Sequence, residues 1–519
     1  MSAEGAEGAG LRLSSTAGRW VLVATVLGSS LAAIDSTVVG IAVPSIGRDF
    51  HLAVSSLQWV VTGYLLTLAG LLLVGGSLGD HFGRRKVFVI GVVWFAVASL
   101  LCAVATGSGF LIGARILQGA GGALLTPGSL AILQASFAPE DRSRAIGAWA
   151  GLGGVGTAVG PFLGGFLVQA VSWRLIFVIN LPLAVLVVAV ALRHVPESRD
   201  PDATGPVDVV GGALVTTGLL ALTAALIEAP TRGWDSGFVV GTLAGSLVLF
   251  ALFVVRERRT THPLLPLAMF AARQFSAINA VTFVVYGALG GALFLLPVEL
   301  QQVSGYSPLQ SGIALLPLTA VLLALSSRSG ALAARIGPRL QLSVGPVLVG
   351  AGMALFYLVG PSGNYLTEVL PAVAVLALGL AVTVAPLTAS ALAAAPDEHA
   401  SLASAVNNDV ARAGSLVAVA VLPALSGLDG RSYLHPVLFS AGFHRAVVVA
   451  GVVAAAGGVL GAVSVRDPGR AGHLRPKRRS VVCCPLDATS LVASVPEPAR
   501  GHLGRRPARR APGARQWRP

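Results

Sequence analysis

Two charged residues lie inside stretches of the sequence that are otherwise apolar. Asp35 falls in the apolar run 20–43, and Arg115 falls in the apolar run 109–132. A charged side chain in a membrane span costs about 2.5–3.5 kcal/mol, so such residues usually face a cavity or a partner and serve function. At 1.5 Å per helical residue, Asp35 lies about 13 Å from Pro44 at the outer end of its run. Arg115 is the natural partner by depth.

The chemistry open to this pair is the uptake and release of a proton. Burial away from water favours the neutral form of a carboxyl group, whereas a nearby cation favours the ionised form. An acid balanced between these influences can take a proton from one side of a membrane and release it on the other. An arginine does not titrate usefully, so Arg115 would modulate Asp35 or hold a water chain. The alternative is a fixed ion pair in a helix interface.

A second group of charges follows the apolar run 58–79. Asp80 is accompanied by Arg84, Arg85 and Lys86. Basic residues at this position anchor a helix end at the cytoplasmic surface, but anchoring does not explain the acid. We expect a charge latch that holds one conformation closed.

The run 401–426 contains a further acid and base. Asp409 and Arg412 are three residues apart, so on a helix they can neutralise each other. The residues alone leave open whether the two are structural or line a cavity.

Other kinds of chemistry lack the residues they need. The nine histidines show no metal-binding spacing, and there is no Walker loop for ATP. Residues 151–156 fit the GxGxxG pattern, but they lie in an apolar run and Ile176 stands where a dinucleotide fold needs an acid. We therefore expect no cofactor, no metal and no catalysis. A membrane-embedded enzyme or sensor remains a remote alternative.

The composition assigns these residues to a bilayer. Hydrophobic residues make up 54% of the 519 residues and charged residues only 11%, against roughly 25% charged in soluble domains. A spanning helix needs about 20 apolar residues. The sequence predicts fourteen spans, at 20–43, 58–79, 87–106, 109–132, 145–169, 174–193, 208–229, 237–255, 274–300, 308–333, 340–361, 367–394, 401–426 and 445–465.

The distribution of basic residues predicts the topology. One set of alternate loops holds 15 Lys and Arg residues and the other set holds 5. Cytoplasmic loops carry the excess, so both termini are expected in the cytoplasm, in a multi-pass protein of the cytoplasmic membrane. Of the net charge of +13, residues 466–519 supply most, with 13 Lys and Arg against 3 acids. This Pro- and Arg-rich tail is predicted to be disordered, and nucleic-acid binding has no support.

A weak internal repeat suggests the organisation of the spans. Residues 76–85 and 330–339 share Gly, Leu, Gly and Arg at matching positions, and parallel repeats are a transporter architecture. The predicted organisation is an all-α membrane protein with two six-helix bundles and two additional central helices. Its parts are a cytoplasmic segment 1–19, a bundle 20–194, a linker with the two helices 195–255, a bundle 256–465 and the basic tail 466–519.

Five motifs in order resemble the major facilitator superfamily, and within it the fourteen-helix drug:proton antiporter branch. They span most of the chain outside the tails. Gly40 departs from the pattern, which usually has Asn there. The motifs are residues 34–44, residues 76–85, the set Arg115, Gln118 and Gly119, residues 156–165, and residues 173–182.

The resemblance implies roles for particular residues. Proton coupling or the substrate cavity would involve Asp35, Arg115, Gln118, Asn407 and Arg412. The conformational motif would consist of Gly76, Asp80, Gly83, Arg84 and Arg85. The helix-five antiporter motif would consist of Gly156, Gly160, Pro161, Gly164 and Gly165, where small residues allow close helix packing and proline loosens the helix.

The resemblance also implies a function. The expected protein exports drugs, antibiotics or similar small amphipathic or cationic compounds by proton antiport with alternating access. Its partners would be the small-molecule substrate, protons and the lipid bilayer, without an obligatory protein partner, and the proton gradient would supply the energy. Export of an endogenous metabolite and substrate:proton symport remain alternatives.

Overall fold

The computed structural model describes residues 10–200, 203, 205–394, 400–428, 430 and 435–467. The first nine residues and almost all of the predicted basic tail, from residue 468 on, lie outside the described residues. The expectations for that tail are therefore not addressed by the structure.

Fourteen helical spans in this described part are long and apolar enough to cross a membrane, which confirms the predicted number. Apart from one isolated bridge between Leu11 and Phe137, the described residues form no β-structure. The helices are α1 (Thr16–Phe50), α2 (Val54–Phe82), α3 (Arg84–Ala103), α4 (Ser108–Ser136), α5 (Pro139–Ala170), α6 (Leu175–Val178), α7 (Asn180–His194), α8 (Val209–Arg232), α9 (Gly237–Arg259), α10 (Arg273–Gln302), α11 (Pro308–Ala314), α12 (Leu316–Ile336), α13 (Arg339–Leu355), α14 (Leu370–Ala393), α15 (Ala400–Leu425) and α16 (Pro436–Ser464).

Two of the spans are divided into a short and a long α-helix. The sixth consists of α6 and α7, and the tenth consists of α11 and α12. Pro182 lies in the first turn of α7 and Pro317 in the first turn of α12. Proline has no backbone N–H and clashes with the preceding turn, so a helix tends to break just before it. Each division therefore has a local cause in the sequence.

The last span begins earlier than the sequence predicts. The expected start at residue 445 was wrong, because α16 begins at Pro436. His444 and Arg445 suggested a helix boundary, but both lie inside the helix. The His444 ring is 2.8 Å from the carbonyl oxygen of Val359, which gives one of these polar groups a partner.

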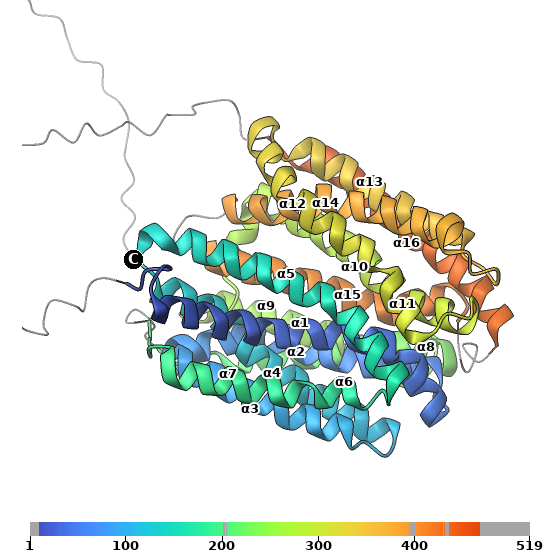
Figure 1. Ribbon diagram of the computed structural model, residues 1–519, viewed down its shortest axis with the longest axis horizontal. Coiled ribbons are helices and arrows are strands. Elements are labelled where there is room, and N and C mark those ends of the chain that lie inside the picture. Colours follow the sequence, from blue (N-terminus) through green and yellow to red (C-terminus); the bar gives the residue numbers. More distant parts are fainter. Residues whose placement is uncertain are drawn as a thin grey trace, which may run out of the picture. The chain divides into compact units, whose positions relative to one another are not determined.

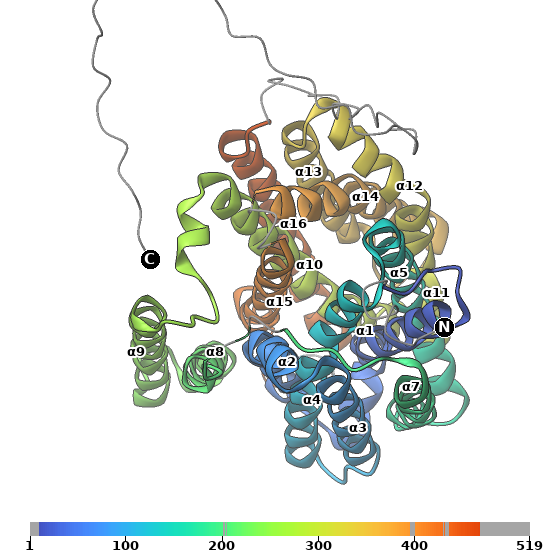
Figure 2. The same cartoon turned by 90° about the vertical axis from the view of Figure 1, so that its left-hand side faces the viewer.

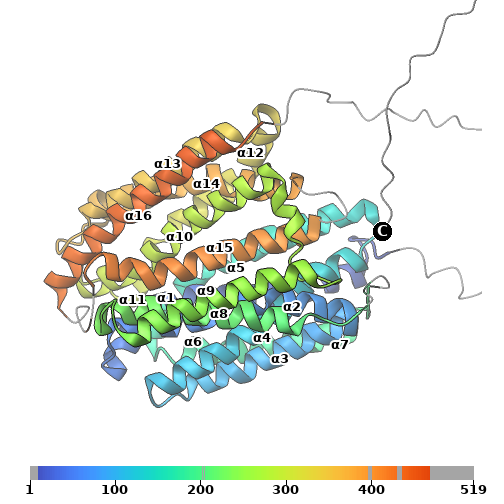
Figure 3. The same cartoon turned by 180° about the vertical axis from the view of Figure 1, so that it is seen from behind.

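The helices form two groups with a pair beside them. Helices α1 to α7 pack mainly on one another, and so do α10 and α12 to α16, whereas α11 packs mainly on α5. Helix α8 lies against α2 and α15, and α9 packs on α8 (Figures 1 and 2). The same flank position of α8 and α9 is visible from behind (Figure 3). We call the end of the helices that carries residues 76–85 the motif end, and the other the opposite end.

Hydrogen bonds join the two groups only at the opposite end, within the described residues. Gln58, near the start of α2, donates to the carbonyl oxygens of Val419 at 2.7 Å and Ala420 at 3.0 Å on α15. Gln301, near the end of α10, donates to the carbonyl oxygen of Ile41 on α1 at 2.9 Å. The two groups are therefore closed on each other at this end.

Glycines of α5 permit its close contact with α1. Gly156, Gly160 and Gly164 are four residues apart and share a helix face. Methyl groups built on them would collide with the side chains of Ser30, Thr37 and Val38, respectively. The absence of side chains thus sets the α1–α5 distance, as the small-residue spacing predicts.

The same helix contacts the second group of helices. A methyl group on Gly165 would lie 2.5 Å from the carbonyl oxygen of Pro308 on α11, and one on Gly312 would collide with the carbonyl oxygen of Pro161. Helix α5 is therefore packed tightly between α1 and α11.

We predict that Gly160→Val lowers the stability of the protein by about 1–3 kcal/mol, because the added side chain overpacks the contact with Thr37. Thermal unfolding of the detergent-purified protein measures the change. Gly151→Val is the matched control on the same helix, since a methyl group there meets open space. Equal unfolding temperatures for the two variants would contradict the tight α1–α5 contact.

Candidate functional site

Asp35 and Arg115 form a buried ion pair. Arg115 Nη1 on α4 lies 2.5 Å from Asp35 Oδ2 on α1, and each residue is only 1% exposed. Arg115, which its depth in the membrane suggested as the partner of Asp35, is therefore in direct contact with it. Removing two charges from water is costly, and only close geometry with further hydrogen bonds offsets that cost.

Two amides complete the environment of the carboxylate. Asp35 Oδ1 accepts hydrogen bonds from Gln118 Nε2 at 2.8 Å and from Asn180 Nδ2 at 2.9 Å. Both amides also donate to the hydroxyl oxygen of Ser99 on α3, at 2.8 and 3.2 Å. Gln118 was singled out from the sequence, whereas Asn180 was noted only as part of a motif and Ser99 not at all. Helices α1, α3, α4 and α7 thus meet at one acid.

The guanidinium of Arg115 is held on its other sides as well. Its Nε donates to the carbonyl oxygen of Val60 at 3.2 Å, and Nη1 also donates to Gln118 Oε1 at 2.5 Å. The guanidinium carbon lies 4.3 Å from the centre of the Tyr64 ring. A cation over an aromatic face is stabilised by the ring quadrupole. The arginine is therefore fixed in position by three kinds of partner.

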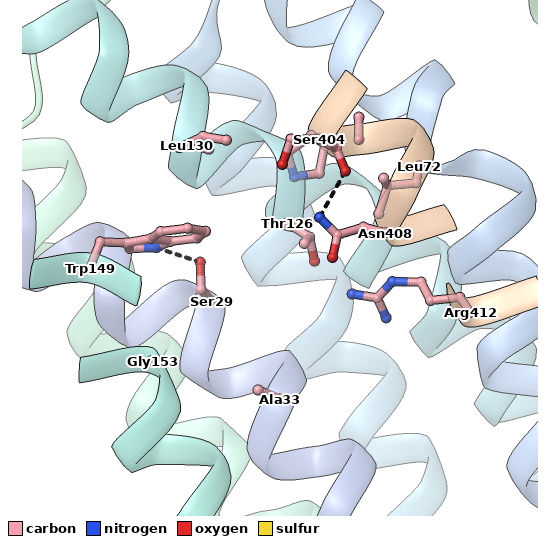
Figure 4. A pocket seen from close by; sticks show the side chains of 12 residues that line it. Ser29, Ala33, Leu72, Thr126, Leu130, Trp149, Gly153, Ser404, Asn408 and Arg412 are labelled. Carbon is pink, nitrogen blue, oxygen red and sulfur yellow. Dashed lines mark hydrogen bonds between the residues drawn. The ribbon is translucent and has the colours of Figure 1, made fainter. Parts of the chain in front are cut away.

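A cavity of about 420 Å³ lies beside this cluster, between the two groups of helices. The cavity lies nearer the motif end than the contacts of Gln58 and Gln301, which close the opposite end. In Figure 4, Trp149 lies on one wall and the guanidinium of Arg412 extends from the other. Asp35 does not line it, although its neighbour Ala33 does. The lining residues are Ser29, Ala33, Leu72, Thr126, Pro127, Leu130, Trp149, Gly153, Ser404, Ala405, Asn408 and Arg412.

The structure separates two residues that the sequence grouped together. Arg412 lines the cavity. Asn407 is buried against α10, where its amide donates to Asn279 Oδ1 at 3.1 Å and to Thr282 Oγ1 at 2.8 Å. The next residue, Asn408, is the asparagine that lines the cavity.

Asp409 and Arg412 do not form an ion pair with each other among the described contacts. Asp409 lines a separate, mostly apolar cavity of about 300 Å³ between α2, α8, α9 and α15. The two charged side chains therefore line different cavities.

The charged motif at residues 76–85 is bonded within its own half of the protein. Arg84 Nη2 lies 2.7 Å from Asp80 Oδ1, and its distance to Asp200 Oδ2 is 3.9 Å. Gly83 joins α2 to α3 with a positive φ of 112°, which glycine adopts without strain. In the described residues, no hydrogen bond or ion pair links this motif to α10–α16. Gly76 leaves space for a methyl group, 3.6 Å from Pro127.

Glu197 is a participant that the sequence did not reveal. Its carboxylate accepts hydrogen bonds from the backbone N–H groups of Arg85, at 3.0 Å, and Lys86, at 3.2 Å, in the first turn of α3. An acid at a helix N-terminus also interacts favourably with the helix dipole. Arg85 in turn donates to the carbonyl oxygen of Val195 at 3.0 Å. The linker after α7 is thereby attached to the motif.

A model of the Major Facilitator Superfamily matches residues 25–420, which is more than half of the chain. The chain belongs to the major facilitator superfamily. The family predicted from the motifs is thus confirmed, and its members are transporters embedded in membranes by multiple helices.

Curated relatives of this superfamily member are named for resistance and export. It is 37% identical over 405 residues to the tetracenomycin C resistance and export protein of Streptomyces glaucescens, covering 78% of this chain and 75% of that protein. It is 34% identical over 423 residues to the methylenomycin A resistance protein of Bacillus subtilis, covering 81% and 90%.

Solved structures confirm the major facilitator fold. A bacterial homolog of the human lysosomal transporter Spinster, in an inward-facing and unoccupied conformation, matches with a TM-score of 0.62 and 18% identity, covering 87% of this chain and 97% of that chain. A D-xylose-proton symporter matches with a TM-score of 0.62 and 15% identity, covering 87% and 99%.

We predict that Arg115→Gln destabilises the protein by about 3–5 kcal/mol, because it leaves Asp35 buried without its cation. The double variant Asp35→Asn with Arg115→Gln should recover most of that loss, since no unpaired charge remains. Thermal unfolding in detergent is the measurement.

Arg232→Gln serves as the control for these variants, because the Arg232–Glu228 pair has a half-exposed arginine and such pairs contribute at most about 1 kcal/mol. A double variant no more stable than Arg115→Gln alone would show that the pair is not the source of the cost.

Proposed function

We propose that this transporter exports drugs, antibiotics or similar small amphipathic compounds in exchange for protons. The observation that carries the proposal is a buried acid network directly beside a cavity between the two groups of helices. The resistance and export names of the relatives support the direction of transport and the kind of substrate.

The excess of basic residues in alternate loops supports an orientation. It assigns the motif end to the cytoplasm, together with both termini. The cavity then lies on the cytoplasmic side of the closed contacts made by Gln58 and Gln301. The structure corresponds to the state that receives substrate from inside the cell.

Protonation of Asp35 would act on several helices at once. The neutral acid has no charge to hold Arg115, so the contact between α1 and α4 weakens. Helix α1 is also packed on the glycines of α5, and α5 in turn contacts α11 in the other group. A change at the acid can thus reach the contacts that close the opposite end.

Two alternatives within transport predict different vesicle behaviour. A substrate:proton symporter would move substrate and protons in the same direction, whereas an antiporter moves them in opposite directions. Inverted vesicles acidified inside should accumulate the substrate of an antiporter and not that of a symporter. A panel of antibiotics against an expressing host separates drug export from export of an endogenous metabolite.

We predict that Asp35→Asn abolishes gradient-driven uptake into inverted vesicles, because asparagine cannot bind and release the coupling proton. Asp235→Asn, at an exposed position between α8 and α9, is the matched control and should transport normally. Membrane levels of both variants are compared by immunoblot. Gradient-dependent uptake by Asp35→Asn equal to that of the control would refute the coupling role.

We also predict that Asp80→Asn lowers the maximal transport rate several-fold and changes the half-saturating substrate concentration much less. Asp80 bonds to Arg84 at the joint between α2 and α3 and does not line the central cavity, so its loss should affect conformational exchange rather than binding. Initial rates at a series of substrate concentrations separate the two effects. A loss confined to affinity would contradict the latch.

A further inference from the structure

Arg412 is the only charged side chain among the described residues that line the central cavity. Its side chain extends from α15 into the cavity, toward Thr126 and Ala33 (Figure 4). Within the described residues, the guanidinium has no hydrogen-bond acceptor and no carboxylate within 4.0 Å. It therefore differs from Arg115, which bonds to Asp35, Gln118 and the carbonyl oxygen of Val60.

The nearby acids are committed elsewhere. Asp35 is paired with Arg115 and is only 1% exposed. Asp409 is directed to the separate cavity bordered by α8 and α9. Nearer the motif end, Asp80 pairs with Arg84 and Asp208 pairs with Arg256 at 2.7 Å. Asp409 interacts with Arg412 electrostatically but does not contact it, so the wall of the central cavity presents a guanidinium without a direct counter-ion.

A charged group in a membrane span that lacks a protein counter-ion is expected where a substrate supplies the opposite charge. The guanidinium is planar, always protonated, and matches the two oxygens of a carboxylate or a similar acid. A cationic ligand would meet repulsion there. The charge of the wall therefore favours anions.

The rest of the lining is suited to an apolar ring. Trp149 faces the cavity from α5, and its indole Nε1–H donates to Ser29 Oγ at 3.0 Å, which fixes the ring. Leu72, Leu130 and Pro127 add apolar surface. A volume of about 420 Å³ falls within the range of drug-sized sites.

We propose that the central cavity selects amphipathic anions, namely compounds that carry an ionised acid group on an aromatic ring system. The acid group bonds to Arg412, and the ring lies against Trp149 and the apolar wall. The proposal rests on the export function above and narrows its substrates, because the sequence alone left cationic and other amphipathic compounds equally open.

The test uses three fluorescent probes that share one ring and differ in charge. They are anthracene-9-carboxylate, anthracene-9-methanol and 9-(aminomethyl)anthracene. Binding to the full-length protein in nanodiscs is measured by fluorescence titration. The carboxylate should bind about tenfold or more tightly than the ammonium compound, as a charge-assisted hydrogen bond allows.

The variants identify the residue responsible. Arg412→Gln should weaken carboxylate binding about tenfold and change binding of the neutral alcohol less than about twofold. Arg412→Lys keeps the charge and should retain the preference for the anion. Arg193→Gln removes a charge at an exposed position on α7 and should leave all three affinities unchanged.

Two results would overturn the proposal. One is ammonium binding as tight as carboxylate binding, and the other is an anion preference that persists undiminished in Arg412→Gln. Absence of saturable carboxylate binding to the wild type would also contradict it. Gradient-driven uptake into inverted vesicles is measured separately. Uptake of the ammonium probe alone would support export and contradict the preference for anions. Selective anion binding without any uptake would support the preference for anions and contradict export.

Discussion

A charge buried in a membrane span must have its counter-charge and hydrogen bonds in fixed positions, and the Asp35 carboxylate imposes this requirement on the N-terminal helices. Its oxygens accept from Arg115 and Gln118 on α4 and from Asn180 on α7. Ser99 on α3 accepts from both amides. Four helices are thus held in register by one acid. The cost of leaving any of these polar groups without a partner in a low-dielectric interior is what makes the arrangement specific.

The second constraint is the close approach of helices through glycine. Helix α5 uses one set of glycines against α1 and another contact, at Gly165 and Pro161, against α11. It is therefore coupled both to the helix that carries Asp35 and to the other half of the protein. Gln58 and Gln301 add hydrogen bonds across the halves at the same end. Closure at one end leaves the central cavity on the other side of these contacts, so the acid network and the cavity are parts of one packed arrangement.

The sequence predicted the fold well because the bilayer imposes a simple rule of about 20 apolar residues per span. It failed at the start of α16, where His444 and Arg445 lie inside the helix and His444 contacts the carbonyl oxygen of Val359, 85 residues away. The Asp35–Arg115 contact followed from depth alone. Asn180 and Glu197 could not be found in this way, since they bond to groups 145 and 112 residues away. Asn407 and Asn408 are adjacent and of the same residue type, so the sequence does not show which of them faces the cavity.

Asp35 is almost completely buried and lies away from the cavity wall. Coupling to the proton and recognition of the transported compound are therefore carried by different residues. Trp149 and Arg412 line the cavity, whereas Asp35 does not line it and is only 1% exposed. Competition between proton and cargo for a single carboxylate is therefore not required, and the two can communicate through helix positions. Substitutions in the cavity wall can then alter the range of cargo while the acid network stays intact. Such a division allows one scaffold to acquire new specificities in few mutational steps.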